Sequence, residues 1–148
     1  MTVKEYLKRT RKEAAELKYL TEVREAKWYS LLPKGISYDR DKVQTSPVDV
    51  LSQTAAEINA LDKKIAEITT KLAKHKAFAL EMVNSLDDSN ERMVLMMYYL
   101  TYKVDDKGIE HKFTWEDIAE RIDYSRSSVY QIHDRAIVHI SQKYKSLD

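Results

Sequence analysis

The chain has 148 residues, with 25 lysines and arginines against 24 aspartates and glutamates, and a formal net charge of +1. This length suits one domain, or one small domain with an extended arm. Because the total charge is near zero, a nucleic-acid-binding patch requires local segregation of charge. The chain has no cysteine, which excludes disulfides, thiolate catalysis and cysteine-based zinc sites.

The composition favours helix, because only two glycines and two prolines occur and helix-forming residues are abundant. No apolar run is long enough to cross a bilayer, and residues 1–6 lack the apolar core of a signal peptide. We therefore expect a soluble cytoplasmic protein without a membrane partner.

Residues 3–31 have the spacing of a helix with a heptad seam, which contains two threonines and an arginine. An amphipathic helix packed on a neighbour is one interpretation, and a self-associating coiled coil is the other. Pro33 and Gly35 end this helix, and residues 33–46 are predicted to be a connector. The seam consists of Val3, Leu7, Thr10, Ala14, Leu17, Thr21, Arg24, Trp28 and Leu31.

A second long helix is predicted over residues 48–86. Ser46 is a suitable N-cap, Pro47 suits the first helical position, and Asp49 favours the positive end of the helix dipole. Uninterrupted by glycine or proline, this helix would span roughly 60 Å and needs a partner helix. We expect both the first helix folding back on it and a homodimer formed through residues 3–31 and 48–86.

The pattern breaks at residues 86–90, and a third helix is predicted from Glu91 to about Tyr102. Its methionines and aromatic residues are interpreted as core. Residues 103–113 are polar and irregular. Within them, residues 104–109 suit a short hairpin with Gly108 at positive φ.

Residues 114–133 have the features of a helix-turn-helix. Thr114 and Asp117 resemble a capping box for the first helix, and Ser125 is a suitable N-cap for the second. Asp123 occupies the turn position that usually carries glycine, since aspartate tolerates the left-handed region. Ala119 is the small residue where the helices cross, and Tyr124 is expected to fill the turn. The predicted packing residues are Ile118, Ala119, Ile122, Tyr124, Val129 and Ile132.

Charge is segregated between the two helices of this motif. Residues 115–124 carry Glu116, Asp117, Glu120 and Asp123 against Arg121, whereas residues 125–145 carry Arg126, Arg135, Lys143 and Lys145 against Asp134. The N-terminal end of the second helix meets base edges in this motif, and arginine and glutamine suit guanine and adenine there. We expect base contacts from Arg126, Ser127, Tyr130 and Gln131, and DNA-backbone contacts from Lys112, Thr114, Ser125, Ser128 and Arg135.

Residues 86–140 resemble region four of bacterial sigma factors. The likeness lies in residues 96–100 (MMYYL), 114–119 (TWEDIA) and 124–133 (YSRSSVYQIH). With residues 41–47 (DKVQTSP) ahead of a long helix, the whole chain is similar to phage-encoded regulators of the ArpU and RinA type. The resemblance implies an all-helical regulator of phage or prophage promoters in a bacterial host cytoplasm. It also implies a contact with RNA polymerase, for which the acidic face of residues 116–123 is the expected surface.

The sequence therefore predicts an all-α protein with two domains. Residues 1–86 form a helical hairpin or coiled-coil arm, and residues 87–148 form the helix-turn-helix domain. The leading function is a transcriptional regulator that binds double-stranded DNA and activates phage late genes. The alternatives are a packaging protein of the small terminase subunit class and a helical interaction protein without a nucleic-acid role. No residues are arranged for catalysis, a metal or a cofactor.

Overall fold

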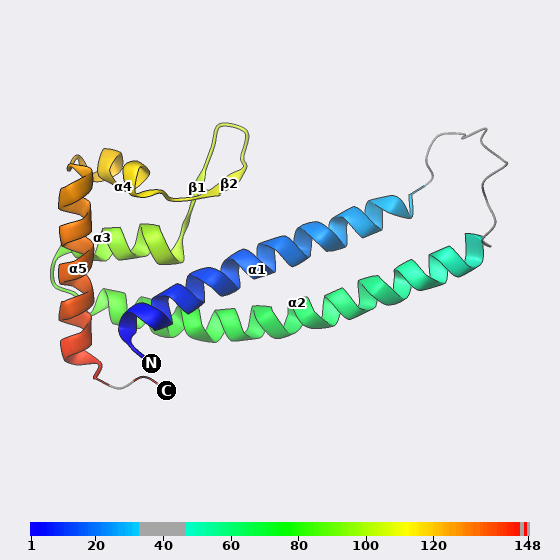
Figure 1. Cartoon of the computed structure of the whole chain (residues 1–148), viewed down its shortest axis with the longest axis horizontal. Helices are drawn as coiled ribbons and strands as arrows, with labels where there is room; N and C mark the ends of the chain where they lie inside the picture. Colours follow the sequence, from blue (N-terminus) through cyan, green and yellow to red (C-terminus); the bar gives the residue numbers. More distant parts are fainter. Residues whose placement is uncertain (33–46, 146, 148) are drawn as a thin grey trace. The chain divides into compact units, whose positions relative to one another are not determined.

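The computed structural model describes residues 1–32, 47–145 and 147. Its elements in chain order are α1 (Val3–Ser30), α2 (Pro47–Asn84), α3 (Ser89–Leu95), the π-helical turn η2 (Met96–Leu100), β1 (Tyr102–Val104), β2 (Glu110–Lys112), α4 (Trp115–Ile122) and α5 (Arg126–Lys143) (Figure 1). The predicted all-α class, with two long helices ahead of a helix-turn-helix, is confirmed. The predicted connector at residues 33–46 lies outside the described residues.

The chain divides into two compact units. One is Ala14–Lys71, and the other combines Met1–Glu13 with Leu72–Asp148. Both long helices therefore contribute to both units. Within the described residues, no helix combines the length and the apolar character that a membrane span requires.

In the unit Ala14–Lys71, α1 and α2 run antiparallel. The Arg24 Nε lies 2.5 Å from an Asp62 carboxylate oxygen, and the Lys27 Nζ lies 2.6 Å from a Glu57 carboxylate oxygen. The later residue on α1, Lys27, pairs with the earlier residue on α2, Glu57, so the two helices run in opposite directions. The arginine in the predicted seam thus forms an ion pair with the neighbouring helix of the same chain.

In the second unit, the first turns of α1 pack with the end of α2 and with α5. The Tyr6 ring meets Phe78 edge-on at 5.3 Å, and the His75 Nδ1 lies 2.7 Å from a Glu13 carboxylate oxygen. Leu7 of α1 and Ile140 of α5 are fully buried in the same apolar cluster. The first thirteen residues are therefore packed with the C-terminal part of the chain.

The third helix is shorter than the sequence predicts, because α3 ends at Leu95 and a π-helical turn runs on to Leu100. Tyr102 is instead in β1, where it pairs with Lys112 of β2 in an antiparallel two-stranded sheet. The hairpin turn contains Gly108 at φ +78°, as predicted. The hairpin ends beside Phe113, which is buried in a second apolar cluster with residues of α4 and α5.

A candidate nucleic-acid interface

Helix α4 begins with the predicted capping box. The Thr114 hydroxyl accepts a hydrogen bond from the Asp117 amide at 3.1 Å, and the Asp117 carboxylate accepts one from the Thr114 amide at 2.9 Å. Lys103 of β1 donates to the other carboxylate oxygen at 3.1 Å. The bonds from Thr114, followed by the one from Lys103, lower the pKa of Asp117, so the box holds an ionised carboxylate at neutral pH.

The turn between α4 and α5 adopts the expected geometry. Asp123 lies in the left-handed region at φ 59° and ψ 46°, where a non-glycine residue is uncommon. The Tyr124 amide donates to the Ala119 carbonyl at 3.0 Å, which closes α4. Ser125 then caps α5, because its hydroxyl accepts a hydrogen bond from the Ser128 amide at 3.2 Å.

The two helices pack through a shared apolar cluster. Ile118, Ala119, Val129 and Ile132 are buried in it, and Ile122 is partly buried at its edge. Apolar contact of this kind holds α4 and α5 at a constant geometry.

Tyr124 differs from the sequence prediction, which placed it in the packed turn. Its side chain is 46% exposed. Because Tyr124 belongs to the short link between the end of α4 and the cap of α5, its side chain follows the surface toward α3. There its hydroxyl accepts a hydrogen bond from the Asn90 amide nitrogen at 3.2 Å.

The predicted base-contacting residues lie on the exposed side of the N-terminal half of α5. Arg126, Ser127, Tyr130 and Gln131 are all exposed. The Arg126 guanidinium donates to the Tyr130 hydroxyl at 3.1 Å and lies 3.2 Å from a Glu116 carboxylate oxygen. This ion pair is open to solvent, so it restrains Arg126 only weakly.

The residues predicted to contact the DNA backbone differ in their exposure and in the interactions that they already make. The hydroxyls of Thr114 and Ser125 serve as helix caps, and the Ser125 hydroxyl also donates to Ser128 at 2.8 Å. Lys112 is exposed at the end of β2. The half-exposed Arg135 side chain lies 3.4 Å from the carboxylate of Glu91, which is buried in α3.

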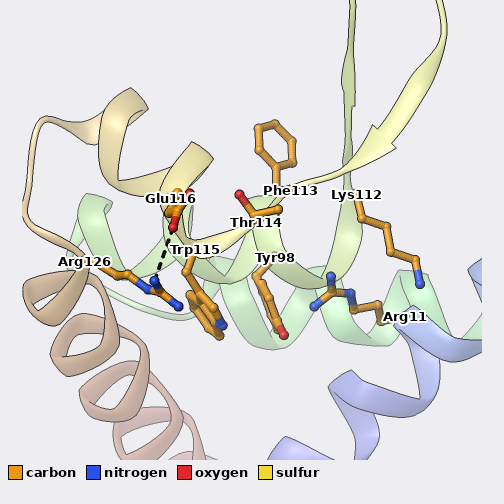
Figure 2. A pocket seen from close by; sticks show the side chains of 8 residues that line it. All are labelled: Arg11, Tyr98, Lys112, Phe113, Thr114, Trp115, Glu116 and Arg126. Atoms are coloured by element: carbon orange, nitrogen blue, oxygen red, sulfur yellow. Dashed lines mark hydrogen bonds and ion pairs between the residues drawn. The ribbon is translucent and has the colours of Figure 1, made fainter.

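A surface hollow of about 360 Å³ brings several of these residues together (Figure 2). Along it, the Tyr98 ring stacks on Trp115 at 3.9 Å, and the Arg11 guanidinium lies 3.8 Å from the Tyr98 ring centroid. Sequence reasoning did not identify Arg11, Tyr98 or Trp115 as site residues. The hollow is lined by Arg11, Tyr98, Lys112, Phe113, Thr114, Trp115, Glu116 and Arg126.

His133 lies behind this surface and is buried. Its Nε2 is 2.7 Å from the Tyr99 hydroxyl, and its Nδ1 is 3.1 Å from an Asp134 carboxylate oxygen. Burial lowers the pKa of His133, against the opposing effect of Asp134. The imidazole is therefore neutral at pH 7.

Residues 85–142 match the protein family described as Sigma-70, region 4. This stretch runs from α3 to α5 and includes the whole helix-turn-helix. Comparison with curated proteins and with solved structures gave no match. The helix-turn-helix in the C-terminal part of the chain is thus similar to sigma region four.

Proposed function

We propose that this protein is a sequence-specific DNA-binding regulator of transcription that inserts α5 into the major groove. The match of residues 85–142 to sigma region four carries this proposal. The exposed N-terminal half of α5 supports it, because that part of the second helix meets base edges in helix-turn-helix complexes.

The roles of the individual residues follow from their chemistry. Arg126 presents a planar fork of donors that suits the O6 and N7 atoms of guanine, and Gln131 suits adenine. Ser127 and Tyr130 flank them on the same exposed side of α5. The phosphate contacts fall to residues around the helix N-termini and to nearby cations: Lys112, Thr114, Ser125, Ser128 and Arg135.

The test is selection of bound duplexes from random DNA, followed by affinity measurements on the selected sequence and on an unrelated one. We expect clear sequence preference and binding that weakens steeply with salt. Arg126→Ala and Gln131→Ala should each lower affinity for the selected sequence about ten-fold and relax the preference at one base pair. Gln142→Ala, an exposed change near the C-terminal end of α5, is the matched control. Binding without any sequence preference would refute the proposal.

A narrower proposal concerns the biological setting. The likeness to ArpU- and RinA-type regulators supports an activator of phage late genes in the bacterial cytoplasm, with the acidic face of residues 116–123 contacting RNA polymerase. Transcription in vitro from a promoter carrying the selected sequence should rise when the protein is added. Repression would contradict this narrower role. A ring-shaped oligomer without promoter activity would favour the packaging alternative.

We also propose that the protein acts as a homodimer through its long helices. Apolar side chains remain exposed on the unit Ala14–Lys71, including Trp28 at 50%, Tyr29 at 65% and Leu51 at 51%. Covering such a surface by a second copy would remove it from water. A mass in solution equal to two chains is the expected result, and a monomer at micromolar concentration would contradict it.

A further inference from the structure

Three cations lie on one face of the first turns of α1. Lys4, Lys8 and Arg11 follow the spacing i, i+4 and i+7, which aligns side chains along one side of a helix. Lys4 and Lys8 are exposed. Val3 and Leu7, on the same turns of α1, are buried in one apolar cluster with Ala136 and Ile140 of α5. The turns of α1 that carry these cations therefore share an apolar core with the helix proposed to enter the groove.

Arg11 is held at the edge of the hollow by an aromatic stack. Figure 2 shows Tyr98 between Arg11 and Trp115, with all three side chains next to one another. Trp115 in turn lies 5.0 Å from the Tyr130 ring on α5. A guanidinium held by an aromatic face loses less freedom when it binds an anion than one that extends into water.

The lining of the hollow suits a negatively charged group. Arg11, Lys112 and Arg126 contribute cations from three separate elements. Glu116 contributes a carboxylate, but one of its oxygens already lies 3.2 Å from Arg126. The forked donors of arginine match the oxygens of a phosphodiester.

The position of the hollow agrees with the path of DNA on such a motif. The first helix of a helix-turn-helix crosses the DNA backbone. Thr114 and Trp115, at the start of α4, line the same hollow as Arg11. A backbone that passes the start of α4 therefore comes within reach of α1.

We propose that the first turns of α1 extend the DNA-binding surface beyond the helix-turn-helix, with Arg11 binding a backbone phosphate beside the sequence that α5 reads. Lys4 and Lys8 continue this contact along α1. The inference rests on the proposed function, since it concerns the same DNA. It gives the N-terminal residues a role outside the stretch that matches sigma region four.

The experiment measures how affinity depends on salt for full-length Arg11→Ala, on the selected duplex and on an unrelated duplex. Loss of one phosphate contact should reduce the slope of log affinity against log salt by about one. At about 0.1 M salt, this corresponds to a five- to ten-fold weaker affinity, by roughly the same factor on both duplexes. Lys64→Ala is the matched control, because it removes one exposed cation from the other unit and should leave the slope unchanged.

The outcomes separate this inference from the proposed function. If Arg11→Ala matches both wild type and Lys64→Ala while wild type binds its selected sequence, the inference is wrong and the proposed function stands. A loss confined to the selected sequence would show a base contact and overturn the phosphate assignment. If wild type shows no sequence preference on DNA, both proposals fail. If Arg11→Ala lowers the helical content, Arg11→Gln is tested instead under the same criteria. Glutamine removes the charge, but its side chain is long enough to cover the Tyr98 ring.

Discussion

The capping box at the start of α4 allows a quantitative prediction of stability. Thr114→Ala removes the hydroxyl that accepts from the Asp117 amide at 3.1 Å and donates to the Asp117 carboxylate at 2.9 Å. Loss of an N-cap typically costs about 1 kcal/mol. For a chain of this size, that corresponds to a fall in Tm of about 2–4 °C. Thr114→Ser keeps the hydroxyl and should retain most of the stability.

Tryptophan fluorescence during urea unfolding can isolate this effect. The chain has two tryptophans, and Trp28→Phe leaves Trp115 as the sole reporter. Trp115 is the first residue of α4, and its ring contacts Tyr98 and Tyr130. Its emission should therefore report loss of the helix-turn-helix. The expected result is a lower urea midpoint with an unchanged dependence on urea concentration.

The pH dependence provides a second test of the same box. The folded pKa of Asp117 is lowered, so its contribution to stability is present above the unfolded value of about 4 and is lost as pH falls through the folded value. The difference between wild type and Thr114→Ala should therefore shrink as pH falls from about 5 to 3. Equal midpoints at pH 7, or a Thr114→Ser variant as unstable as Thr114→Ala, would refute the reasoning.

Three further predictions concern neighbouring residues. Glu116→Gln should raise DNA affinity on the order of two- to five-fold, because it releases Arg126 from an exposed ion pair and removes a negative charge near the DNA backbone. The gain should vanish when Arg126→Ala is also present. An unchanged affinity for the single variant would contradict this prediction. Because the folded pKa of His133 is lowered, its stabilising contribution is present above about pH 6.5 and is lost as pH falls through the lower folded value. Unfolding free energies measured from pH 7 to 5 should therefore fall more steeply for wild type than for His133→Gln, and parallel curves would count against this. Ala119→Leu should destabilise the α4–α5 packing by about 1–3 kcal/mol, because Ala119 is buried where the two helices meet. A denaturation midpoint equal to that of wild type would contradict this, because it would mean that the packing accommodates the larger side chain.

Local features of the helix-turn-helix were predictable because they depend on neighbours in sequence. Thr114 and Ser125 cap helices through residues three positions ahead, and Asp123 adopts the left-handed conformation that the turn requires. The hairpin around Gly108 followed from the same kind of local rule. Tyr124 was the exception, since its exposure depends on where the link between the helices directs its side chain.

The sequence by itself determined the helical class, the two long helices, the caps and the likeness to sigma region four. Periodicity and capping act over a few residues, so they can be recognised along one stretch of chain. Only the tertiary structure decided that Arg11 meets Tyr98 and that Trp115 completes the stack. These contacts join residues far apart in sequence, and no local pattern distinguishes Arg11 from the other cations of α1. The physical reason is that packing between helices distant in sequence places Arg11 on the Tyr98 ring. The same packing brings the N-terminal helix to the proposed DNA surface.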